Sequence, residues 1–184
     1  MIFHKILVAL DPIDPDRDFF DRAVAMAKAA DAELLLLSVL TSDGGGMFLK
    51  PHPQVVGYND ALNDWNLFQK RYEEYKEGSL SVLRNCAKQA TAAGVRASFK
   101  QSSGSPGREI CRIAKAEEVD LIIVGSRGYR GFDEMLLGSV SNYVAHHAPC
   151  SVMMVHPQQG AKLQTESVSK KETTAVVAQA VLEA

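Results

Sequence analysis

The sequence predicts a single α/β domain in which a parallel sheet carries helices on both faces. Five short apolar segments alternate with segments of helical periodicity between Ile2 and Val155. This alternation is typical of parallel sheets, because two parallel strands must be joined by a crossover, which is usually a helix. Residues 34–40 are almost continuously apolar, as expected for a strand that is covered on both sides. We therefore expect a doubly wound sheet with one hydrophobic core on each face.

Each element follows from local signals. The expected strands cover 2–10, 33–40, 95–101, 120–124 and 150–155. The first helix is expected to have Asp14 as its N-cap and Pro15 at its first position. A long helix begins near 59–63 and ends before Gly94, a third opens at Ser105-Pro106, and the last covers 138–147. The apolar stripe of the long helix is predicted to contain Tyr75, Ser79, Val82, Leu83, Cys86 and Ala90, and that of the last helix Val140, Tyr143, Val144 and His147.

Composition and charge exclude several function classes. The net charge of −2 provides no basic surface for nucleic acid or for an anionic membrane. No apolar run reaches the roughly 18 to 20 residues that cross a bilayer. The first residues do not resemble an export signal, and the three cysteines form no CxxC pair. We expect a cytoplasmic protein with reduced thiols that pack as small apolar side chains.

The most informative segment is a spaced glycine array. Gly125-Ser126-Arg127-Gly128 follows a buried strand, and Gly138-Ser139 opens a helix nine residues later. Glycines after a strand let the backbone approach a ligand, and successive N–H groups there can surround an anion. The start of a helix also favours a phosphate, because its N–H groups are unpaired and its dipole is positive. Together the two features can clamp one polyphosphate chain.

Other chemistries lack their motifs. An isolated Gly-x-x-Gly is usually a plain turn, so only the complete array indicates a phosphate site. The sequence contains no GxxxxGK[ST], no HExxH and no GxSxG, and no compact His/Cys/Asp cluster that would bind zinc. No residue is evident as a base that activates water, so we predict no catalytic residue and favour binding over catalysis.

The chain resembles the universal stress protein family, in its nucleotide-binding branch. The segment IIVGSRGYRGFDEMLLGSVSNYVAHHAPCSVMMV, from Ile122 to Val155, is similar to the family pattern almost throughout, as are the strands KILVALD and LLLLSVL. The resemblance implies a five-stranded Rossmann-like sheet in the order 3-2-1-4-5, with nucleotide between strands 1 and 4. It covers residues 1–156, which leaves 157–184 as a polar extension whose last ten residues could form a short helix.

We predict that Mg²⁺ binds with the nucleotide on its phosphates, because two facing anion sites suit a polyphosphate and the local protein charge is too small to neutralise it fully. The resemblance also implies a set of contacts to ATP, or a close adenine nucleotide. Asp11 would meet the ribose or adenine, and Val39 would pack on the adenine. The phosphates and ribose would be lined by Gly125, Arg127, Gly128, Gly138, Ser139, Val140 and Ser141. For three of these residues a plain structural role stays open: a turn for Asp11, core packing for Val39 and a solvated charge for Arg127.

Three functions are compatible with these features of the sequence. The leading one is an ATP-binding stress-response or signalling protein, in which nucleotide occupancy regulates conformation or partner binding. The second is an enzyme, either a slow ATPase or an adenylating enzyme. The third is a nucleotide-independent interaction protein that acts as a dimer. A homodimer through the fifth strand is expected, because that strand lies at the edge of the implied sheet and is apolar.

Overall fold

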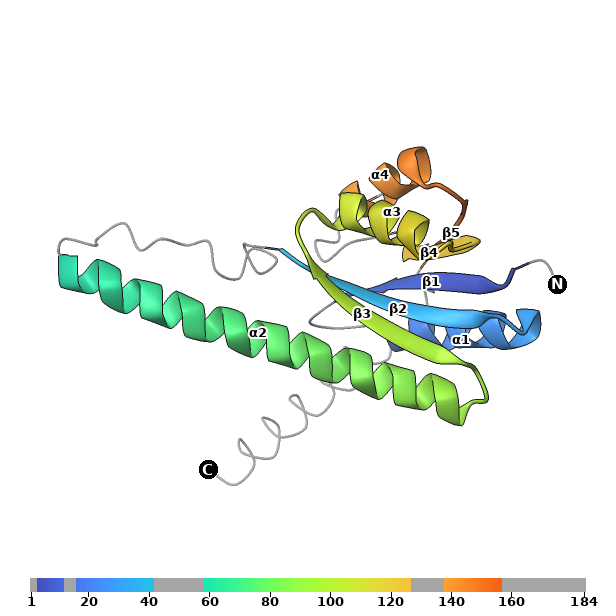
Figure 1. Ribbon diagram of the computed structural model, residues 1–184, viewed down its shortest axis with the longest axis horizontal. Coiled ribbons are helices and arrows are strands. Elements are labelled where there is room, and N and C mark those ends of the chain that lie inside the picture. Colours follow the sequence, from blue (N-terminus) through green and yellow to red (C-terminus); the bar gives the residue numbers. More distant parts are fainter. Residues whose placement is uncertain (1–2, 12–15, 42–57, 127–137, 157–184) are drawn as a thin grey trace, which may run out of the picture.

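A computed structural model describes residues 3–11, 16–41, 58–126 and 138–156. Its five strands form one parallel sheet in the order β3-β2-β1-β4-β5 (Figure 1). The strands are β1 (Lys5–Leu10), β2 (Glu33–Leu40), β3 (Ala97–Ser103), β4 (Leu121–Gly125) and β5 (Ser151–Val155). The predicted fold class and the strand order implied by the family resemblance are both confirmed.

Four helices cover the two faces of the sheet. They are α1 (Arg17–Ala30), α2 (Tyr58–Ala92), α3 (Pro106–Ala116) and α4 (Ser139–His147). Helices α1 and α2 lie on one face, and α3 and α4 lie on the other (Figure 1). In the part of the chain that the structure describes, no helix is long and apolar enough to cross a membrane.

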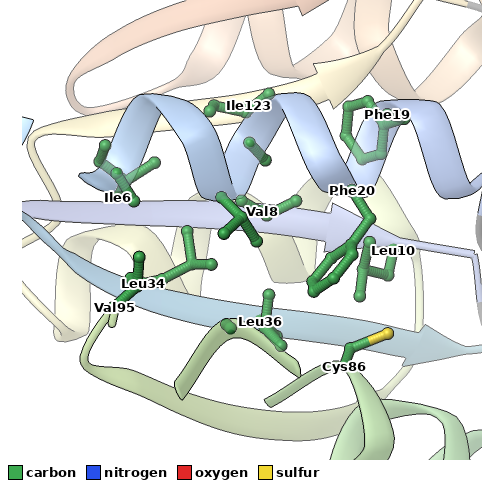
Figure 2. Close-up of a cluster of buried hydrophobic side chains, with 14 of the residues drawn as sticks. Ile6, Val8, Leu10, Phe19, Phe20, Leu34, Leu36, Cys86, Val95 and Ile123 are labelled. Atoms are coloured by element: carbon green, nitrogen blue, oxygen red, sulfur yellow. The ribbon is translucent and has the colours of Figure 1, made fainter. Parts of the chain in front are cut away.

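The central strand β1 supplies side chains to both cores. It pairs with β2 on one side and with β4 on the other. Ile6, Val8 and Leu10 enter the cluster beneath α1 and α2 (Figure 2), whereas Leu7 enters the cluster beneath α3 and α4. Alternate residues of a strand point to opposite faces, so a strand covered on both faces is apolar at most positions.

Three local predictions need correction. The N-cap of α1 is Asp16 rather than Asp14, because the Asp16 carboxylate accepts a hydrogen bond from the Phe19 N–H (3.2 Å). Asp14 and Pro15 lie outside the described residues. Strand β3 begins at Ala97 instead of Val95, since the Val95 N–H still bonds to the Ala90 carbonyl at the end of α2.

The third correction concerns the last helix. The helical spacing predicts His147 on its apolar face, yet this side chain is exposed, and the buried residues of α4 are Ser141 and Val144. The His147 ring stacks on Tyr143 (centroids 4.0 Å apart), and its Nδ1 lies 2.8 Å from the Tyr143 carbonyl oxygen. A local partner in the last turn therefore holds the imidazole at the surface.

Helices α3 and α4 approach each other at a buried glycine. A Cβ atom on Gly107 would lie 2.8 Å from Tyr143 Cδ1 and 2.9 Å from Tyr143 Cβ and Cγ. Real Cβ atoms do not approach other atoms so closely, so the crossing of the two helices requires glycine at this position.

Charged side chains link β1 and β3 to the end of α3 and the start of β4. The Glu117 carboxylate, just past α3, accepts hydrogen bonds from Lys100 of β3 and from Lys5 of β1 (Lys5 Nζ to Oε2, 2.9 Å). Both bonds lower the pKa of Glu117, to about 2, and the bond from Lys100 has the largest effect. Asp120 accepts from the backbone N–H groups of His4 and Lys5, which lowers the pKa of its carboxyl group.

We predict opposite effects for two glycine-to-alanine substitutions. Gly107→Ala should destabilise the protein by about 1–3 kcal/mol, because the methyl group meets the Tyr143 ring. Gly78→Ala, in α2, should stabilise it by about 0.5–1 kcal/mol, because nothing lies within 4 Å of the added Cβ and alanine favours the helix. Urea unfolding of both variants checks this pair. Equal stability of the two would show that the α3–α4 contact is not as tight as described.

Glu117→Gln should change the acid end of the stability profile. Because its pKa in the folded protein lies below the ordinary value of 4.5, the ionised carboxylate stabilises the fold above pH 4.5, and this contribution is lost as the pH falls toward about 2. The melting-temperature difference between wild type and Glu117→Gln should therefore shrink as the pH falls from about 4.5 to about 2. Glu118→Gln, at an exposed neighbouring position, is the matched control. A difference that stays constant over this window contradicts the prediction.

Candidate functional site

The candidate site lies at the edge of the sheet where the strands end, which we call the carboxyl edge. From the first strand, β1, the chain builds the sheet outward through β2 and β3 on one side and then through β4 and β5 on the other. The connections after β1 and β4 thus diverge, and in open α/β sheets this divergence leaves a crevice where ligands bind. Asp11 follows β1 here and Gly125 ends β4.

Backbone hydrogen bonds join the end of β4 to the start of α4. The Gly138 N–H donates to the Ser126 carbonyl (3.0 Å), and the Ser126 N–H donates to the Val155 carbonyl of β5 (2.9 Å). The two glycine-containing segments of the predicted array are therefore adjacent in space, although 127–137 separates them in sequence. The structure brings together Gly125, Gly138 and the residues that follow Gly138.

The first turn of α4 points its amide groups toward this edge. Gly138 is the N-cap, and its carbonyl accepts the first helical bond from the Asn142 N–H (2.9 Å). No side chain of the described residues caps the helix start, and no acidic residue lies in its first turn. The N–H groups of Ser139, Val140 and Ser141 and the helix dipole therefore favour an anion at this position.

The three serines of the site differ in their surroundings. Ser139 is exposed. Ser141 is buried, and its hydroxyl lies 3.0 Å from the Gly138 carbonyl oxygen and 3.4 Å from that of Ser126. Ser126 is also buried, and its Oγ has no hydrogen-bond partner among the described residues. Such an atom is costly to leave unpaired, and it lies beside the helix start.

Apolar side chains stand next to the polar groups. Val39, near the end of β2, is buried in the cluster beneath α3 and α4. Ala9 of β1 and Val140 of α4 pack against the same cluster and are partly exposed. Ala9, Val39 and Val140 thus share one apolar cluster, which we call the apolar wall. The polar end of the candidate site consists of Gly125, Ser126 and the first turn of α4.

The remaining predicted residues are placed as follows. Asp11 is half-buried and directly follows β1, the strand beside Val39. Arg127 and Gly128 lie outside the described residues. Sequence reasoning did not select Ser126 or Ala9. Ser126 stands inside the glycine array, which could have drawn attention to it, whereas nothing in the sequence distinguishes Ala9 from any other strand residue.

Catalytic and metal chemistry have little support at the described residues. Burial raises the pKa of the Cys86, Cys111 and Cys150 thiols, so these groups are poor nucleophiles. Among residues 3–11, 16–41, 58–126 and 138–156, no three His, Cys, Asp or Glu side chains are grouped to hold a metal ion.

A shallow cavity of about 200 Å³ lies elsewhere, between β3 and α3. Its cations, Lys100 and Arg112, are paired with Glu117 and Glu109. The pairing leaves this cavity without the uncompensated charge that would attract an ionic ligand.

The sheet order, with connections that diverge after β1 and β4, defines a doubly wound α/β protein whose candidate ligand site is at the carboxyl edge. The chain belongs to the universal stress protein family, whose model matches residues 2–156.

Individual relatives agree with this assignment. Universal stress protein YxiE of Bacillus subtilis is 35% identical over 160 residues, with 84% of this chain and 99% of the relative covered. Universal stress protein Sll1388 of Synechocystis is 31% identical over 155 residues, with 84% and 99% covered.

Solved structures share the fold at lower identity. Hypothetical protein MJ0577 superposes with a TM-score of 0.68 at 22% identity, covering 87% of this chain and all of that one. A universal stress protein family member from Arabidopsis thaliana, solved with AMP bound, has a TM-score of 0.58 at 23% identity, covering 85% of this chain and 93% of that one. A universal stress protein in complex with cAMP has a TM-score of 0.55 at 22% identity, covering 85% and 98%.

Proposed function

We propose that this chain is a cytosolic, ATP-binding stress-response or signalling protein in which nucleotide occupancy regulates conformation or partner binding. The observation that carries the proposal is the hydrogen bond from the Gly138 N–H to the Ser126 carbonyl. It sets the uncapped start of α4 directly beside the end of β4. A helix start in this position is suited to a phosphate group.

The chemistry of the surrounding residues fits an adenine nucleotide. The wall of Ala9, Val39 and Val140 suits the flat, apolar faces of a purine ring. Asp11 would accept from ribose hydroxyls or the adenine amino group, and the exposed Ser139 hydroxyl would donate to phosphate or ribose oxygens. Arg127 and Gly128 would line the phosphates. The relatives solved with AMP and cAMP support this ligand class.

We further propose that Mg²⁺ enters with the nucleotide. Magnesium keeps several waters and is commonly held by substrate phosphates with one or two carboxylates. The described residues contain no carboxylate cage, so the metal would bind chiefly to the phosphates. Its charge would offset that of the polyphosphate, for which the chain's net charge of −2 offers no compensation.

Titration calorimetry should detect ATP binding that strengthens when Mg²⁺ is added. Gly138→Val should weaken it by at least about tenfold, or 1.4 kcal/mol, because the branched side chain obstructs the helix start. Folding should survive, since the backbone angles of Gly138 (φ −57°, ψ 152°) suit any residue. Gly78→Ala, remote in α2, is the control and should bind like wild type. No heat from any adenine nucleotide at millimolar concentration would contradict the proposal.

Two serine-to-alanine variants, compared by the same calorimetry, separate ligand binding from stability. Ser139→Ala should weaken binding several-fold and leave the melting temperature unchanged, because this hydroxyl is exposed. Ser141→Ala should also lower the melting temperature, because its hydroxyl is buried against the Gly138 and Ser126 carbonyls. Equal effects of the two variants on stability and on binding would favour a purely structural role for the helix start.

We also propose a homodimer through β5. In the described sheet β5 has β4 on one side and no strand on the other. Val152, Met153 and Met154 are only partly buried, so this edge is apolar as well as unpaired. Two copies related by a twofold axis would cover both edges at once.

Light scattering should find a dimer for the full chain and for a chain that ends at Gln158. Residues 157–184 follow β5 directly, so the comparison shows whether they compete for the edge. Monomers in both samples would contradict the dimer. A full chain that is monomeric and dimerises only when shortened would show that the C-terminal residues cap β5.

A further inference from the structure

Helix α2 is much longer than the sheet that it covers. Its 35 residues span roughly 52 Å at 1.5 Å per residue, whereas the eight residues of β2 span about 27 Å. The residues described as buried in α2 all lie in its second half: Ser79, Leu83, Cys86, Ala87 and Ala90. The first half extends past the sheet (Figure 1).

An aromatic stripe continues the buried face of α2 into this overhang. Phe68, Tyr72 and Tyr75 have the same helical spacing as Ser79 and Leu83. The Phe68 and Tyr72 rings stack with centroids 6.4 Å apart, and Tyr72 contacts Tyr75 at the same distance. All three side chains are half-buried, so they retain apolar surface in water.

Two polar contacts join α2 to β3 partway along this stripe. The Gln101 side chain donates to the Lys76 carbonyl (3.0 Å), and the hydroxyls of Tyr72 and Ser103 lie 3.5 Å apart. Ser103 is the last residue of β3, so Phe68, one helical turn before Tyr72, lies beyond the end of the strand. Another apolar segment would be stabilised by packing on this part of the helix.

The chain leaves β5 on the same face of the sheet as α2. Arg22 of α1 donates to the His156 carbonyl oxygen (Nη1 to O, 3.1 Å). Val155 is buried in the cluster that lies beneath α1 and α2. Residues 157–184 therefore start beside α1, at the carboxyl edge past which α2 extends.

The polar part of this extension is long enough to cross the sheet from β5 to β3, the edge strand beside α2. Residues 157–174 give a root-mean-square span of about 23 Å at 5–6 Å times the square root of residue number. The four strand spacings from β5 to β3 amount to about 19 Å. A linker whose span equals the separation of two sites gives nearly the highest effective concentration of one at the other.

The last ten residues have the chemistry to cover the stripe. Ala175–Ala184 reads AVVAQAVLEA, in which Val177, Val181 and Ala184 recur at helical spacing. A helix this short is marginal by itself and needs a surface. Lys170 and Lys171 precede it, and the exposed side chains of Glu74 and Glu77 flank the stripe. We propose that Ala175–Ala184 docks within the same chain on the aromatic stripe of α2.

Amide hydrogen exchange along α2 tests this docking. Compared with the full chain, a chain ending at Gln158 should show amide exchange over 66–76 about tenfold faster, equivalent to about 1.4 kcal/mol of opening free energy. A synthetic peptide of residues 170–184 should restore the slow exchange.

Matched substitutions separate docking from the effect of an added charge or of any change in α2. In the full chain Val177→Asp should reproduce the truncation, whereas Ser167→Asp, which adds the same charge in the linker, should behave like wild type. Phe68→Ser in the shortened chain should abolish peptide binding. Leu67→Ser should preserve it, because Leu67 is 46% exposed and lies about 100° around the helix from Phe68.

Two results would overturn the proposal. Equal amide exchange over 66–76 in the full and shortened chains would show that the extension does not cover α2. If the slow amide exchange of the full chain is lost on dilution, a second copy, rather than the same chain, covers the aromatic stripe. None of these measurements uses nucleotide, so they stand apart from the proposed function.

Discussion

The hydrogen bond between the Gly138 N–H and the Ser126 carbonyl is the contact on which the candidate site depends. It holds the start of α4 against the end of β4 at 3.0 Å, and the Ser126 N–H in turn bonds to Val155 of β5. These two hydrogen bonds set the direction of the α4 dipole. They also set the position of Val140 in the apolar wall and the burial of Ser141. Ser126 directly follows β4 and Gly138 directly precedes α4, so this bond fixes the start of the helix against the sheet.

The two faces of the sheet are built differently. Beneath α3 and α4 the helices cross at Gly107, where no Cβ fits against Tyr143. Beneath α1 and α2 the core is larger, and one buried polar pair crosses it: the Ser38 and Ser79 hydroxyls lie 3.0 Å apart. Because shifting α2 along its axis would leave both hydroxyls buried without a partner, this pair favours one position of the helix on β2.

That fixed position of α2 decides which part of the helix leaves the sheet. With Ser79 held opposite Ser38, the first half of α2 extends past the carboxyl edge of the sheet (Figure 1). The candidate nucleotide site and the overhang therefore share one edge of the molecule but belong to opposite faces. The phosphate-binding chemistry proposed for one face and the docking proposed for the other use different residues, so each can change without removing the other.

The sequence by itself determined the strands, the helices and their alternation, because buried parallel strands and amphipathic helices have hydrophobic patterns that can be read locally. It also selected Gly125, Gly138 and Ser139, which the structure brings to one edge. The strand order came only from the resemblance to a family. The sequence pointed to Asp14 as the N-cap, because Pro15 follows it, and this prediction was wrong. Asp16 is an equally good capping residue, and the local pattern did not reveal that it takes this role.

Tertiary structure decided what depends on contacts between distant residues. Val39 and Val140 belong to different elements, and only the folded sheet places them in one cluster. The burial of the Ser126 hydroxyl, which has no hydrogen-bond partner among the described residues, is likewise a result of packing. The end of α2 and the pairing with β2 compete for the residues before β3. Val95 remains bonded to the end of α2, so pairing with β2 begins at Ala97. Local pattern reports which residues prefer to be buried, whereas long-range packing determines which of them meet.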